Sequence, residues 1–165
     1  MGRYQVSNQT RIRTRGFTVI ELIVVITVIA ILAGVVISVN FNLQAQARDT
    51  ERTADIGVIT RSIERYYQTE SVALGGTYPS TASGTNGIGT IVNDIESVKA
   101  PTQPGNSVVM ATSAAAQTPT AGQYIYQPLT VSGAICNATP CVRFKLYYYL
   151  EVTKEIIIVN SMRQQ

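Results

Sequence analysis

The feature that most constrains this chain is a long apolar segment near its beginning. From Leu22 onward the 165-residue sequence carries no charged side chain until Arg48, and residues 22–37 are almost entirely aliphatic. About 20 consecutive apolar residues suffice to cross a bilayer as an α-helix, so the pattern predicts a membrane-spanning helix. One carboxylate, Glu21, stands at the beginning of this helix, where burial in lipid costs on the order of a few kcal/mol unless the charge has a partner. The presence of Glu21 therefore indicates that this carboxylate has a charged partner or a functional role.

A basic stretch precedes the apolar segment and ends in a short motif. Residues 1–16 contain four arginines and no acidic residue, and the last of them is followed by the ordered set Gly16, Phe17, Thr18 and Glu21. This order resembles the N-terminus of the type IV pilin superfamily, which includes the pseudopilins of type II secretion. The resemblance extends over about residues 11–48, and beyond them it is one of architecture only.

The resemblance implies a processing site and an assembly residue. A prepilin peptidase would cleave between Gly16 and Phe17 and would then methylate the new Phe17 amine. Glu21 would pair with the Phe17 ammonium of a neighbouring subunit, which in hydrocarbon would offset much of the cost of the carboxylate. The implied partners are further copies of the chain in a helical filament, the inner membrane, a pilus assembly platform and a cytoplasmic ATPase.

The charge distribution predicts the orientation in the membrane. The four leader arginines favour a cytoplasmic N-terminus with the remainder of the chain outside. We therefore expect a single-pass inner-membrane protein that later becomes part of an extracellular pilus. Without residues 1–16 the chain has 13 − 4 = 9 basic and 10 acidic residues, a net charge of −1, so no specific nucleic-acid partner is predicted. A signal peptide would have a shorter apolar core with the cleavage site after it.

No proline occurs before Pro79, so one unbroken helix is predicted from residue 17 to about residue 70. The predicted divisions are a leader, a transmembrane and filament-core half of the helix, an amphipathic half and a globular head, at residues 1–16, 17–40, 41–70 and 71–165. The amphipathic half should turn one apolar stripe toward the core of the head: Phe41, Ala45, Ile56, Ile59, Ile63, Tyr66 and Tyr67.

Two further features of the amphipathic half are predicted from spacing. Four residues on nearly the opposite side could pack against neighbouring helices in a filament: Leu43, Ala47, Ala54 and Val58. Three pairs of opposite charge stand three positions apart and could pair along the helix: Arg48 with Glu51, Arg52 with Asp55, and Arg61 with Glu64.

The head is predicted to combine loops, one short helix and several strands. We expect a loop over residues 71–89, a helix over residues 90–99 and an exposed loop over residues 111–122. Strands are predicted over residues 107–110, over residues 123–127 with Pro128 ending the strand, and in a hairpin of residues 142–152 and 155–160. The predicted fold class is α+β: a pilin-like long N-terminal helix packed against a small antiparallel sheet of about three to four strands.

Cys136 and Cys141 are the two cysteines of the chain. Outside the cytoplasm they could form a disulfide around a short loop, and free thiols are the alternative.

The chain contains no histidine, so neither a Ser-His-Asp nor a Cys-His catalytic arrangement is possible. No enzyme activity, cofactor or metal site is predicted. Only Asp94 and Glu96 are acidic between Ser71 and Leu150, which is too few for a calcium site. Within the family that the N-terminus resembles, the major pseudopilins of type II secretion commonly have such a site, so this count is evidence against a major pseudopilin.

These features together favour a structural subunit. We expect the precursor of a type IV pilus subunit that polymerises through its apolar helix. Two alternatives stay open from the sequence. One is a pseudopilin of a type II secretion or DNA-uptake system, and the other is a membrane-anchored binding module that never polymerises.

Overall fold

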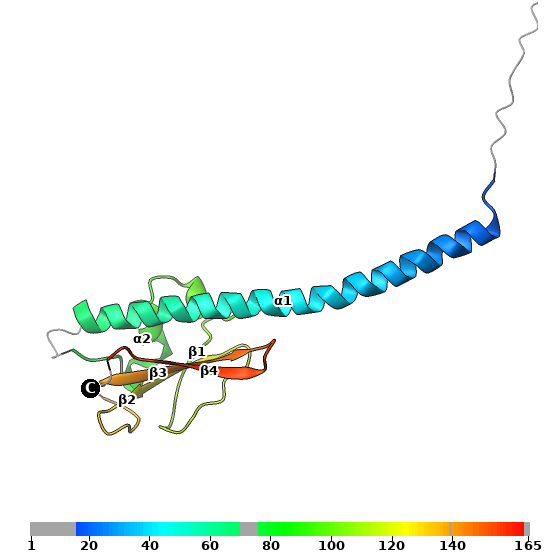
Figure 1. Ribbon diagram of the computed structural model, residues 1–165. Helices are drawn as coiled ribbons and strands as arrows, with labels where there is room; N and C mark the ends of the chain where they lie inside the picture. The colour runs from blue at the N-terminus through cyan, green and yellow to red at the C-terminus, as the bar shows by residue number, and fades with distance from the viewer. Residues whose placement is uncertain (1–15, 70–75, 139, 164–165) are drawn as a thin grey trace, which may run out of the picture. The chain divides into compact units, whose positions relative to one another are not determined.

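The structure is a computed structural model that describes residues 16–69, 76–138 and 140–163 (Figure 1). The chain divides into two units, Met1–Asn40 and Phe41–Gln165. Helix α1 (Val19–Thr69) starts in the first unit and continues in the second. The predicted leader before Gly16 and the predicted end of the long helix at residue 70 lie outside the described residues.

The described part of the first unit is the apolar start of α1. The window Val19–Val36 has a mean hydropathy of 3.0, and none of it is buried within the structure. By length and composition this part of α1 can cross a membrane. Its large apolar side chains are all exposed, between 49 % at Val25 and 76 % at Val19.

The second unit has two layers, the C-terminal part of α1 and one four-stranded sheet (Figure 1). The strands are β1 (Val108–Met110), β2 (Tyr124–Leu129), β3 (Arg143–Leu150) and β4 (Glu155–Asn160), and they lie in this order across the sheet. The α+β fold class is therefore confirmed.

The sheet is mixed, which corrects the prediction of a purely antiparallel one. Strand β3 pairs antiparallel with both β2 and β4, whereas β1 pairs parallel with β2. A parallel neighbour needs a long connection that returns the chain to the same end of the sheet. Residues 111–123 provide that connection. We predicted residues 111–122 as a loop without recognising what such a connection implies for strand direction.

The core lies between α1 and one face of the sheet. Ile56, Ile59 and Ile63 of α1 are at most 2 % exposed and belong to one cluster with side chains of the sheet. The predicted stripe is confirmed at these positions, because their spacing places them on one side of the helix. Alternation along β3 is confirmed as well, since Phe144, Leu146 and Tyr148 all join the same cluster.

The segment between α1 and β1 differs from the prediction. Helix α2 (Gly84–Ile91) begins inside the predicted loop of residues 71–89 and includes only the first two residues of the predicted helix. Short 3₁₀ turns lie at η2 (Thr81–Ser83) and η3 (Glu96–Val98). The prediction that an α-helix continues to residue 99 is wrong, because α2 ends at Ile91. Asp94 accepts hydrogen bonds from the Glu96 N–H at 3.1 Å and from the Ser97 hydroxyl at 2.9 Å. Such local bonds compete with helical ones.

Strand β2 continues through Pro128 to Leu129, so the prediction that Pro128 ends it is also wrong. Strand β1 pairs with β2 only as far as Tyr126. Beyond that point β2 has a strand partner on the β3 side alone, where Pro128 lies opposite Phe144. Proline is tolerated at such an edge because its missing N–H breaks no bond of the ladder.

Candidate functional site

The motif residues lie together at the start of α1, where Thr18 and Glu21 form a reciprocal helix cap. Thr18 precedes the first helical residue, and both its backbone N–H and its hydroxyl donate to Glu21 Oε2 at 2.8 Å. The Glu21 N–H donates in return to Thr18 Oγ1 at 3.3 Å. This is a capping box, in which a Thr and a Glu three positions later satisfy each other's end of the helix. The Thr-x-x-Glu pattern before an apolar run was visible in the sequence, but we did not interpret it as a cap.

The predicted cleavage site is open to other molecules. Gly16 and Phe17 are exposed, and a Cβ placed on Gly16 would meet no atom within 4 Å. Glu21 uses only Oε2 in the cap, and no described residue donates a hydrogen bond to Oε1. The arrangement thus leaves one carboxylate oxygen and the Gly16–Phe17 peptide bond accessible at the same end of one helix.

A charged cluster attaches the second unit's part of α1 to the turn between β3 and β4. Arg48 donates to Glu151 through Nε at 3.1 Å and through Nη2 at 2.5 Å, and Arg52 donates to Glu151 Oε1 through Nη2. Arg52 also donates to Asp49 Oδ1 at 2.8 Å and to the Ala121 carbonyl at 3.0 Å. Its side chain is only 2 % exposed.

Asp49 binds the backbone of the same turn. Its two oxygens accept the N–H groups of Glu151 and Val152, each at 2.9 Å. Hydrogen bonds from Arg48 are the largest cause that lowers the pKa of Glu151 from 4.5 to about 2; burial acts against them, and Arg52 adds to the lowering. The predicted pairs Arg48–Glu51 and Arg52–Asp55 do not form, because both arginines reach across to Glu151 instead.

Two further carboxylates on α1 bind tyrosine hydroxyls. Tyr124 on β2 donates to Asp55 Oδ2 at 2.7 Å, and Tyr78 donates to Glu64 Oε2 at 2.8 Å. Burial is the main cause that raises the pKa of Asp55, although the bond from Tyr124 acts against it. Glu64 also accepts the Met162 N–H at 2.8 Å. Glu64 therefore faces the head, and its predicted pairing with Arg61 is not found among the described ion pairs.

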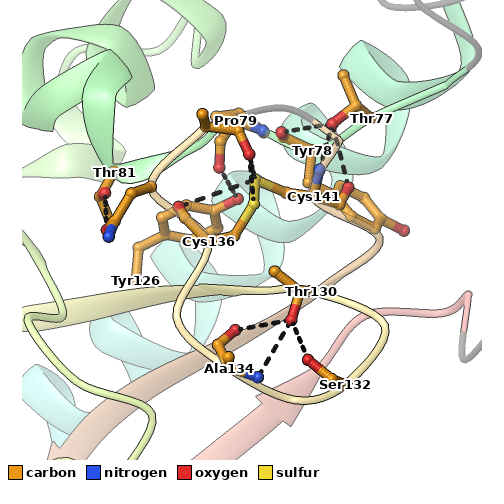
Figure 2. Close-up of a disulfide and its surroundings, with 12 residues drawn as sticks. Thr77, Tyr78, Pro79, Thr81, Tyr126, Thr130, Ser132, Ala134, Cys136 and Cys141 are labelled. Carbon is orange, nitrogen blue, oxygen red and sulfur yellow. Dashed lines mark hydrogen bonds between the residues drawn. A yellow bond between two sulfur atoms is a disulfide. The ribbon is translucent and has the colours of Figure 1, made fainter.

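Cys136 and Cys141 form a disulfide, shown in Figure 2, with both side chains buried. The short loop that it closes is fastened to the segment that follows α1. The Tyr78 N–H donates to the Cys141 carbonyl at 2.8 Å, and the Cys141 N–H donates to Thr77 Oγ1 at 2.7 Å. The Thr81 N–H donates to the Cys136 carbonyl at 3.0 Å.

Within the part of the chain that the structure describes, no group of three or more His, Cys, Asp or Glu side chains could hold a metal ion. The buried acids Asp49, Asp55 and Glu64 are each occupied by donors from the head. Through these contacts the charged side chains of α1 have a structural role in the second unit.

Comparison with known proteins identifies the N-terminal segment. Residues 11–37 match the family described as the prokaryotic N-terminal methylation motif. No curated protein and no solved structure gives a significant match to the chain. The motif covers the Gly16–Phe17 peptide bond, the capping box and most of the apolar helix, so the chain carries the N-terminal signature of type IV pilins and pseudopilins.

Proposed function

We propose that this chain is the precursor of a type IV pilus subunit. It is inserted in the inner membrane, cleaved after Gly16, methylated at Phe17 and polymerised through its apolar helix into an extracellular filament. One observation carries the proposal: the methylation motif runs without a break into a helix whose window Val19–Val36 is entirely unburied within the structure. A prepilin peptidase, an assembly platform and an ATPase are the partners that this function requires.

The apolar surface of α1 supports polymerisation. Side chains such as Ile23, Ile26 and Ile29 are about half exposed or more, and apolar surface of this extent is stable only in lipid or against other apolar surface. Lipid can cover the helix before assembly. Outside the membrane, the corresponding helices of other copies supply a cover of the same chemistry.

Glu21 supports a defined register between copies. Its Oε2 is used by the cap within its own helix, while Oε1 accepts nothing from the described residues. A Phe17 ammonium from a neighbouring copy can donate to that oxygen, which would neutralise both charges in an apolar filament core. Cap and ion pair can therefore exist together. The cap requires an oxygen acceptor on the side chain of residue 21, whereas the ion pair requires its negative charge.

The variant Glu21→Gln tests the ion pair separately from the cap. Glutamine also forms a capping box, so this variant keeps the helix start but loses the negative charge. We expect normal membrane insertion and normal cleavage after Gly16, with filament yield reduced by tenfold or more because a buried ammonium is left without its counter-charge (about 1.4 kcal/mol per tenfold). The readouts are mass spectrometry of the mature N-terminus, including methyl-Phe17, and electron microscopy of sheared filaments.

Thr18→Ser is the matched control, because serine preserves the cap as well as the charge. Wild-type filament yield from Glu21→Gln would overturn the ion pair, and a chain that keeps residues 1–16 in its final form would overturn the proposed function. Subunits that stay in the cell envelope, with secretion lost when the gene is deleted, would assign a pseudopilin. Correct insertion with no assembly under any condition would assign a non-polymerising membrane anchor.

A further inference from the structure

Three charged side chains of α1 in the second unit have no partner among the described residues. The other charged side chains of this part of α1 are engaged by hydrogen bonds or ion pairs with the rest of the unit: Arg48, Asp49, Arg52, Asp55 and Glu64. The side chains of Glu51, Arg61 and Arg65 are exposed and form no hydrogen bond or ion pair with any residue that the structure describes. Water solvates an exposed charge, so what these side chains can bind depends on their arrangement along the helix.

The three charges lie on one stripe of α1, which we call the charged stripe. It consists of Glu51, Ala54, Val58, Arg61 and Arg65, and their spacings of three and four residues bring them to the same side of the helix. Val58 is partly buried, and the other four residues are exposed. The isoleucines that α1 buries in the core lie on the other side, against the sheet (Figure 1). The charged stripe is therefore open to another molecule.

The two signs of charge are separated along the charged stripe. Glu51 stands ten residues before Arg61 and fourteen before Arg65, which corresponds to about 15 and 21 Å at 1.5 Å per residue. The first end of the stripe is therefore negative and the second end is positive. At the positive end, an open depression of about 300 Å³ is lined by Val58, Arg61, Ser62 and Arg65. A depression beside two guanidinium groups suits a carboxylate, which can accept hydrogen bonds from both.

We propose that the charged stripe binds the charged stripe of a second copy of this chain, with Glu51 of one copy beside Arg61 and Arg65 of the other. Two parallel copies at the same height would bring Glu51 opposite Glu51 and arginine opposite arginine, which is repulsive. A displacement of about 15–21 Å along the helix places opposite charges together instead. Ala54 lies between the charges, and its small side chain allows the two helices to approach closely.

Pairing of the charged stripes rests on the proposed function, because a filament holds copies parallel and close together. It adds to that function a set of residues that determine the stagger between copies. Glu21 and Phe17 are only four residues apart, so their pairing requires a much shorter displacement and joins each copy to a different neighbour. Nucleic acid is a poorer occupant of the stripe, because Glu51 would repel its phosphates and only the two arginines of the stripe would attract them.

Two charge-reversed chains test the pairing when each replaces the wild type alone and when they are expressed together. Glu51→Arg makes the whole stripe positive, and Arg61→Glu combined with Arg65→Glu makes it negative. Either chain alone should lower the yield of sheared filaments by about tenfold or more, because like charges then face each other. Together the two chains should restore at least about half of the wild-type yield, since each stripe now meets its opposite. Electron microscopy measures the yield, and mass spectrometry should find both chains in the filaments.

Glu155→Arg is the matched control. It reverses an exposed acid on β4 that lies away from the charged stripe and forms no ion pair among the described residues. Its filament yield should stay within about twofold of the wild type. Each variant should be cleaved after Gly16 and keep the far-UV circular dichroism spectrum of the wild type, because the changes are at exposed positions of the second unit.

Three results would overturn the pairing alone: wild-type yield from either charge-reversed chain, a loss from Glu155→Arg as large as theirs, or no recovery when both folded chains are expressed together. A wild-type chain that keeps residues 1–16 and forms no filaments would overturn the proposed function and the pairing with it. The processing of the N-terminus therefore distinguishes the two failures.

Discussion

Glu151 lies in the turn between β3 and β4, and it decides where two arginines of α1 point. Spacing along a helix predicted local pairs for Arg48 and Arg52, each worth only about 0.2–0.5 kcal/mol. In the structure both guanidinium groups bind Glu151 across about a hundred residues of sequence. A partly buried carboxylate with two arginines is the stronger partner. Helical periodicity contains no information about a residue on a distant turn, so this cluster could not be predicted from the sequence.

The pKa of Glu151 predicts how acid affects the second unit. Its folded pKa of about 2 lies below the ordinary value of 4.5, so its contribution to stability is complete above pH 4.5 and is lost as the pH falls toward 2. Removal of the charge by Glu151→Gln should cost about 2 kcal/mol at pH 7, less than for a fully buried pair because the side chain is partly exposed. Urea unfolding of the wild type and the variant at several pH values measures both effects.

The difference in unfolding free energy between the wild type and Glu151→Gln reports on Glu151 separately from the other titrating groups. Asp55 has a raised pKa and therefore acts in the opposite direction, with stability gained as the pH falls. Asp55 is the same in both proteins, so its effect cancels in the difference. The difference should shrink toward zero between pH 4.5 and 2, and a difference that stays constant over that range would contradict the assigned pKa.

At the scale of elements, prediction succeeded where a long periodic pattern faces one core. The helical stripe at Ile56, Ile59 and Ile63 and the alternation in β3 are such patterns, and strand β4 was predicted with the bounds that the structure has. Helix α2 was missed because it is short and contains Gly84 and Gly87. Its stability comes from tertiary packing of Ile88 in the core, which overrides helix propensity.

The predicted filament-facing side of α1 contains exposed side chains and one that contacts the core. Leu43 and Ala54 are exposed, whereas Val58 is partly buried and packs against the core. Val58→Asp should therefore destabilise the second unit by about 2 kcal/mol or more, because it places a charge against the core. Packing of Val58 between copies stays a prediction, and the structure adds that Val58 contacts the core of its own second unit. Chemical unfolding followed by far-UV circular dichroism measures the effect.

Leu43→Asp is the matched variant, since it places the same charge at a side chain that is 55 % exposed. Its unfolding free energy should stay within about 1 kcal/mol of the wild type. If this side of α1 packs between copies, Leu43→Asp will also lower the filament yield. A Val58→Asp variant as stable as Leu43→Asp would show that Val58 does not contribute to the core.

At the scale of the whole molecule, the α+β class followed from one long helix and a C-terminal hairpin in the sequence. The direction of β1 did not, because a three-residue strand has too little pattern to reveal its pairing. The hydrogen bonds from Gln127 to carbonyls 12 and 14 residues away were also beyond prediction, because no sequence pattern shows that the connection between β1 and β2 lies against β2.

The disulfide stabilises the second unit as a whole through its unfolded state. The bond joins cysteines five positions apart, and a closed loop of this length corresponds to about 2 kcal/mol. Replacement of both Cys136 and Cys141 by serine should lower the unfolding free energy by about that amount and leave the fold intact. Denaturant unfolding of this variant, beside wild-type protein with and without reductant, provides the measurement. Loss of all cooperative unfolding would contradict it.

The attachments between α1 and the rest of the second unit have a mechanical consequence. Asp49 and Arg52 bind the turn between β3 and β4, Arg52 also binds Ala121, and Asp55 and Glu64 bind Tyr124 and Met162. These four residues of α1 are spread over about 22 Å of helix at 1.5 Å per residue. Tension along this part of the helix would load these bonds in shear and at the same time, so no single one would carry the force. A head fastened in this way resists being stripped from its helix more strongly than one whose contacts open in sequence.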